Sequence, residues 1–245
     1  MTASRASAKE SVSERRRPAR IAFDRFAVAV LLCVPAVIAY NWWVIVPFRH
    51  GLLTSVNSFF SDLEVKGARD AALFGKLDLL AGLLFLAALV LSHRREPDRR
   101  WEWRLFLTFA IAAGAGGLFP FSCAEGTDSA CRTSEWHFEL PAHHYAHVLL
   151  SAVEFLSATA ALLVAWRRTR RPGTNPVEAR AFQWLTGIVV IGYLPLAVAY
   201  FSDRLAALVE PMYFLAFSLA VLTEVAGAAH AAHTTNTADT IHAPP

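Results

Sequence analysis

Charged residues are scarce in this chain, and the few present are unevenly distributed. Of its 245 residues 18% are charged and 55% are hydrophobic, and the mean hydropathy is +0.38. Six stretches of about 20 residues carry little or no charge, and this is the length a helix needs to cross about 30 Å of hydrocarbon. The pattern excludes an ordinary soluble domain and predicts an all-α, polytopic membrane helix bundle. The six predicted transmembrane helices are residues 26–48, 71–92, 105–124, 143–166, 181–202 and 205–229.

The distribution of basic residues predicts the orientation. Of the 23 Lys and Arg residues, 17 lie in the N-terminal tail and in the segments after the second and fourth predicted helices. Basic residues stay on the cytoplasmic side during insertion, so we expect a plasma-membrane protein with both termini in the cytoplasm. Residues 1–25 are predicted to be a disordered basic tail, 26–230 the six-helix domain and 231–245 a second flexible tail. The net charge of +3 then reflects topology and contact with membrane lipids, and no nucleic acid partner is expected.

Cysteine is equally sparse. The three cysteines include no CxxC pair, which argues against a redox motif or a cysteine zinc site. Cys123 and Cys131 both lie in the predicted outward segment after the third helix, whereas Cys33 lies inside the first. A disulfide persists in an oxidising compartment, so we predict a Cys123–Cys131 bridge, with two unpaired thiols as the alternative.

A nucleotide-binding loop is also missing. The glycine-rich stretch AIAAGAGGLFPF follows no strand, and its small residues are typical of close packing between membrane helices. Tryptophans lie near the predicted helix ends, Trp42 among them, and this placement is typical of interfacial anchors. The first, third and fifth predicted helices have no charged residue, so we expect the intramembrane polar chemistry on the other three.

The polar residues of the fourth predicted helix form one stripe. At 100° per residue, His143, His144, His147, Ser151 and Glu154 fall within about a third of its circumference. An ionised carboxylate facing lipid at the depth of Glu154 would cost several kcal/mol. Glu154 is therefore expected to face the bundle, to be protonated or to have a partner.

The same histidines have the spacing of metal ligands. His147 and either His143 or His144 can point at one ion, with Asp62 or Asp78 as a third ligand or general base and water as the fourth. Such a zinc site would serve an outward-facing hydrolase or transferase acting on a lipid or envelope substrate, with Glu154 orienting the ligands. HHxxH lacks the Glu of the HExxH motif, and interfacial histidines also bind headgroups or neighbouring helices.

The alternative function is not enzymatic. Glu154 and His147 would gain and lose protons in a small proton-coupled carrier, or the stripe would hold helices together in an accessory subunit. The sequence leaves the enzyme and the carrier open. A bound metal would distinguish the two.

With these residues placed, the chain resembles a family of six-helix bacterial and archaeal membrane proteins known as a domain of unknown function. The resemblance rests on SDL at 61–63, LFP at 118–120 and the histidines that open the fourth helix, and it covers residues 25–230. It implies the six-helix fold and no activity. The Ser/Asp segment and the His143/His147 pair are also distantly similar to the alkaline ceramidase and adiponectin-receptor group, which implies a zinc hydrolase.

Overall fold

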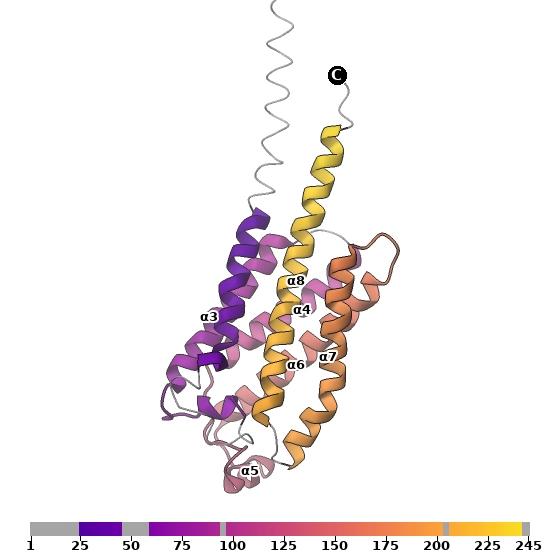
Figure 1. Ribbon diagram of the computed structural model, residues 1–245. Helices are drawn as coiled ribbons and strands as arrows, with labels where there is room; N and C mark the ends of the chain where they lie inside the picture. Colours follow the sequence, from indigo (N-terminus) through magenta and orange to yellow (C-terminus); the bar gives the residue numbers. More distant parts are fainter. Residues whose placement is uncertain (1–24, 46–58, 94–96, 203–205, 242–245) are drawn as a thin grey trace, which may run out of the picture.

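The computed structural model describes residues 25–45, 59–93, 97–202 and 206–241, and these ranges contain helices and no strand. The all-α prediction is therefore confirmed for them, whereas the predicted disorder of the N-terminal tail falls on residues 1–24, outside the described residues. Figure 1 shows long helices packed side by side, with the short helix α5 at one end. The α-helices are Arg25–Tyr40, α3 (Ala71–Ser92), α4 (Arg100–Gly116), α5 (Ser129–Trp136), α6 (Ala142–Thr169), α7 (Pro176–Ser202) and α8 (Ala206–Ile241).

Four helices in the described ranges, α3, α6, α7 and α8, are long and apolar enough to cross a membrane. The helix Arg25–Tyr40 and α4 are shorter; the 17 residues of α4 rise about 26 Å, slightly less than the hydrocarbon thickness. α4 ends at Gly116, earlier than the predicted residue 124, because Gly117 and then Pro120 do not favour a helix. The prediction of a membrane protein is supported, and the count of six spans is not confirmed.

Both described ends of the chain lie at the same end of the bundle. Figure 1 shows the helix Arg25–Tyr40 beginning, and α8 ending, at the end opposite α5. α8 continues to Ile241, past residue 230, where the sequence predicts a flexible tail.

The backbones of α3 and α4 are in close contact through glycines. Gly75 and Gly82 of α3 face Gly117, directly after α4, and Gly114 of α4. A Cβ atom on Gly82 would lie 2.6 Å from the Gly114 nitrogen and 2.7 Å from the Ala110 carbonyl oxygen. Only a hydrogen fits there, so the small residues of α4 allow close packing, as the sequence predicts.

A buried ion-pair network ties the helices together at the end opposite α5. Arg99, just before α4, donates to Glu178 of α7 and to Glu224 of α8, each at 3.0 Å. Arg168 of α6 donates to Glu102 of α4 and to Glu178, each at 2.7 Å. Buried charges are tolerated when they are paired and hydrogen-bonded in this way. The network fixes α4, α6, α7 and α8 relative to one another.

Replacing Gly82 with alanine should destabilise the bundle, because its Cβ would collide with the α4 backbone. Overpacking of a tight core typically costs about 1–3 kcal/mol, so thermal unfolding in detergent should occur several degrees lower. Gly187→Ala in α7 is the matched control, since nothing lies within 4 Å of the added Cβ. Equal unfolding midpoints for the two variants would contradict the glycine contact.

Candidate functional site

A cavity of about 530 Å³ lies within the half of the bundle nearer α5. This volume is typical of a small-molecule site. Its walls come from the helix Arg25–Tyr40, the 3-10 helix η2 (Ser61–Glu64), the segment between α4 and α6, and all of the long helices. No Lys or Arg is among the described residues that line it. Six carboxylic acids do line it: Glu64, Asp78, Glu125, Glu135, Glu154 and Glu210.

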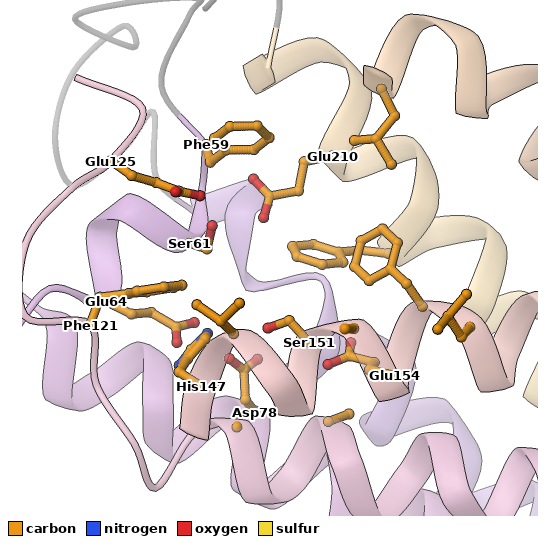
Figure 2. Close-up of a pocket in the computed structure, with 18 of the residues that line it drawn as sticks. Phe59, Ser61, Glu64, Asp78, Phe121, Glu125, His147, Ser151, Glu154 and Glu210 are labelled. Atoms are coloured by element: carbon orange, nitrogen blue, oxygen red, sulfur yellow. The ribbon is translucent and has the colours of Figure 1, made fainter. Parts of the chain in front are cut away.

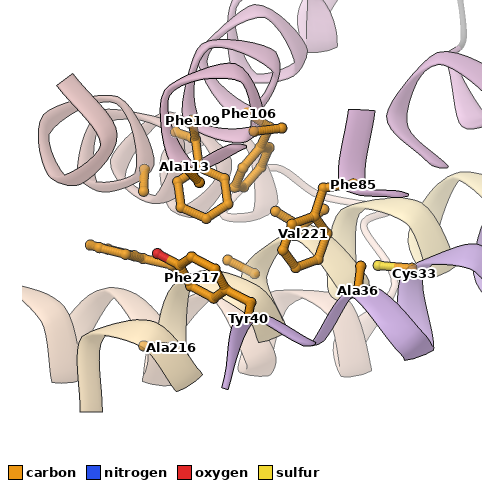
Figure 3. Close-up of a cluster of buried hydrophobic side chains, with 14 of the residues drawn as sticks. Cys33, Ala36, Tyr40, Phe85, Phe106, Phe109, Ala113, Ala216, Phe217 and Val221 are labelled. Carbon is orange, nitrogen blue, oxygen red and sulfur yellow. The ribbon is translucent and has the colours of Figure 1, made fainter. Parts of the chain in front are cut away.

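Asp78 of α3 lies in the cavity wall and contacts a second acid (Figure 2). The indole Nε1 of Trp42 donates to Asp78 Oδ1 at 2.8 Å, and the carboxyl of Glu64 lies beside that of Asp78. Trp42 is buried and stacks on Phe74 with ring centroids 4.1 Å apart. It positions Asp78 and is not the interfacial anchor that the sequence predicts.

Glu154 of α6 lies in the same cavity and faces the bundle interior, with 8% of its surface exposed. The hydroxyl of Tyr40, at the end of the first helix, donates a hydrogen bond to Glu154 Oε1. The absence of charge in the first helix predicts no polar role for it, and the Tyr40–Glu154 hydrogen bond corrects that prediction. The tyrosine at the end of this apolar helix could have indicated a polar contact in the sequence, because a buried tyrosine hydroxyl usually has a hydrogen-bond partner.

His147 is the one of the three predicted histidine ligands that lines the cavity. Its Nδ1 lies 2.6 Å from the carbonyl oxygen of Phe119. A carbonyl only accepts, so Nδ1 carries the hydrogen of this contact. The ring also packs on Phe121, with centroids 3.9 Å apart. Figure 2 shows His147, Ser151 and Glu154 along one wall, as the helical spacing of α6 requires.

His143 and His144 are not among the cavity-lining residues and have other partners. His144 is fully buried; its Nδ1 accepts from the backbone N–H of Ser122 at 3.2 Å, and its Nε2 lies 3.1 Å from Glu135 Oε2. His143 Nε2 lies 3.1 Å from Ser122 Oγ. Across the described residues, no three or more His, Cys, Asp or Glu side chains are grouped so that they could hold a metal ion. The residues predicted to bind zinc therefore do not form a ligand set in this arrangement.

Asp62 fastens the segment that follows α4. Its carboxylate accepts from the backbone N–H groups of Phe59 at 3.1 Å and Gly126 at 3.4 Å. Burial raises the pKa of Asp62 to about 6, although these two hydrogen bonds act to lower it. A Cβ on Gly126 would collide with the Asp62 carboxylate, so the close approach requires glycine. Asp62 is not among the residues that line the cavity, unlike Asp78.

The segment between α4 and α6 forms the outer wall of the cavity. Cys123 and Cys131 form the predicted disulfide there, with their Cα atoms 5.9 Å apart. Glu125 and Glu135 from this segment both line the cavity. Glu125 Oε2 is buried without a hydrogen-bond partner among the described residues. Burial and then the neighbouring Glu135 raise the pKa of Glu125 to about 8.

Comparisons with known proteins identify a family and no activity. A family model described as "Protein of unknown function (DUF998)" matches residues 27–227, which include every residue that lines the cavity. No curated protein and no solved structure matches the chain. Nothing in these comparisons supports the expected similarity to the ceramidase and adiponectin-receptor hydrolases.

Breaking the disulfide should loosen the outer wall of the cavity. Closing a loop of this length stabilises by about 2–3 kcal/mol, so the double variant Cys123→Ser, Cys131→Ser should exchange backbone hydrogens of residues 118–141 at least tenfold faster. Hydrogen–deuterium exchange read by mass spectrometry measures this. Reductant should produce the same change in the wild type and none in the double variant. Unaltered exchange in fully reduced wild type would contradict the prediction.

Proposed function

We propose that this chain, which belongs to the DUF998 family of proteins of unknown function, is a proton-coupled carrier that binds an organic cation in its acidic cavity. The observation that carries the proposal is the charge of the lining, with six carboxylic acids and no Lys or Arg among the described lining residues. The carrier is thus the better supported of the two functions that the sequence leaves open.

The lining favours a cation over an anion. Phosphate or carboxylate groups would be repelled by the acids, and the apolar surroundings would screen this repulsion poorly. A cation would instead offset their charge. Aromatic rings also line the cavity, and ring faces attract cations, above all quaternary ammonium groups. These rings belong to Tyr40, Phe59, Phe121, Phe155, Tyr193, Phe201 and Phe214.

The same lining favours an organic cation over a metal ion. A metal ion needs several oxygens within about 2.0–2.6 Å of one point. The acids here surround about 530 Å³, and the described part of the chain places no three candidate ligands together. An organic cation is large enough to place its charge beside some of the acids and its carbon atoms against the aromatic rings.

Proton coupling follows from an acid that holds a proton at neutral pH. Burial raises the pKa of Glu125 to about 8. The charged groups that act on Glu125 are Glu135 and Asp62, which favour its protonated form, and Arg132, which opposes it. A bound cation favours the ionised carboxylates, so binding releases protons.

The proposal includes the orientation in the membrane. We place the α5 end outside the plasma membrane and both termini in the cytoplasm, with the helix Arg25–Tyr40 and α4 completing six passes. Three observations support this placement: the distribution of basic residues, the shared position of the two described ends of the chain, and the disulfide near α5. The cavity then lies in the outer half of the membrane.

Hydrolysis of a lipid or envelope substrate is the second candidate, and the placement of Glu64 and Asp78 in one cavity favours it. Two neighbouring carboxyl groups, one protonated and one ionised, can act as general acid and general base. The fate of the bound molecule separates the two functions. A carrier releases the cation unchanged, whereas a hydrolase releases products.

Binding of tetraethylammonium should strengthen as the pH rises through about 8, because Glu125 is protonated below this pH and ionised above it. With the full chain in lipid nanodiscs, we expect a Kd several-fold lower at pH 9 than at pH 6.5. Glu125→Gln should flatten the pH dependence. Glu139→Gln, an exposed acid of the same segment outside the cavity, is the control. A wild-type Kd independent of pH, or tighter binding of ethanesulfonate, would contradict the proposal.

A further inference from the structure

The cavity has an opening toward the lipid between α6 and α7. Ala152 and Leu156 of α6, and Ala197 and Phe201 of α7, line the cavity and are also exposed on the outside of the bundle. Leu156 is 67% and Phe201 78% exposed. A side chain that lines a cavity and is also exposed on the face of a membrane helix lies at the rim of a lateral opening.

The rim is apolar, and its α6 side lies deeper in the membrane than three of the six acids. Glu64, Glu125 and Glu135 come from segments at the α5 end, outside the candidate spans. Leu156 lies 14 residues after the first residue of α6, about 21 Å along the helix axis, at the depth of the hydrocarbon. The cavity therefore joins an acidic outer part to an apolar opening.

This arrangement matches a molecule with a charged head and an apolar tail. We infer that the cavity binds a cationic amphiphile, an ammonium head group on an alkyl chain, which reaches it from the outer leaflet through the opening between α6 and α7. The inference rests on the proposed function and names the class of its ligand. The ammonium group lies among the acids, and the alkyl chain passes the apolar rim into the bilayer.

The chemistry of the lining also selects against ordinary membrane lipids. Anionic lipids carry a phosphate that the ionised acids of the lining repel, and no Lys or Arg among the described lining residues offsets that repulsion. Apolar chains gain little on moving from the bilayer to an apolar rim, because both surroundings are hydrocarbon. The charge of the head group therefore determines which amphiphile is retained.

The small residues at the rim provide the test, because bulk at Ala152 or Ala197 would close the opening and leave the acidic part intact. Ala152→Trp and Ala197→Trp are compared with wild type for binding of tetraethylammonium and of dodecyltriethylammonium, which share a head group of nearly the same size. The control is Leu194→Trp, also on α7, which is 74% exposed and is not among the cavity-lining residues. Full-length protein in nanodiscs is used throughout.

The rim variants should bind dodecyltriethylammonium at least tenfold more weakly and tetraethylammonium within twofold of wild type, and the control should change neither. Unchanged binding of the long cation in both rim variants overturns lateral access. Equally weakened binding of both cations also overturns it, because the substitution would then not act on the alkyl chain alone. Any rim variant with a lowered unfolding midpoint is replaced by Ala152→Leu or Ala197→Leu, to which the same criteria apply.

The wild-type protein separates this inference from the proposed function. Binding of tetraethylammonium without binding of dodecyltriethylammonium overturns the inference and leaves the proposed function in place. Binding of neither cation overturns both. If dodecyltriethylammonium binds more tightly than tetraethylammonium, and the rim variants lose this difference, both the inference and the proposed function are supported.

Discussion

Keeping carboxyl groups inside an apolar helix bundle is the constraint on which the rest of this structure depends, because an ionised and unpaired carboxylate there is strongly unfavourable. At the end opposite α5, two arginines pair with three glutamates in one network. In the cavity no Lys or Arg lies among the described lining residues, and neutral hydrogen-bond donors are the partners of two of the acids. Tyr40 donates to Glu154, and Trp42 donates to Asp78. This difference makes one end a fixed structural joint and leaves the other an acidic cavity, which we propose binds a cation.

Features that depend on local sequence were predictable. The bounds predicted for the second helix, 71–92, match those of α3, because charge and hydropathy change sharply at both ends. The inward orientation of Glu154 followed from the energetic cost of facing lipid, and helical spacing then turned His147 and Ser151 the same way. The glycines of α4 indicated close packing, although not that Gly82 of α3 would be the partner.

Features that depend on tertiary contacts were not predictable. The zinc prediction assumed that histidines on one helical face share one target, yet their ring nitrogens are engaged by the segment that folds over the start of α6. His147 bonds to the Phe119 carbonyl and His144 to Glu135, both from that segment. Tyr40 and Glu125 were missed for the same reason, since 114 residues separate Tyr40 from Glu154 and helical periodicity gives no information on such pairs.

The central claim is that a cation binds in this cavity by replacing a proton on its acids. Calorimetric titration of tetraethylammonium into the full chain in nanodiscs at pH 7, in phosphate and in Tris, measures this directly, because the two buffers differ in ionisation enthalpy. The account predicts that the apparent binding enthalpies differ between the buffers by an amount corresponding to release of about one proton per bound cation. Binding with the same enthalpy in both buffers would mean that no proton is released and would contradict the account.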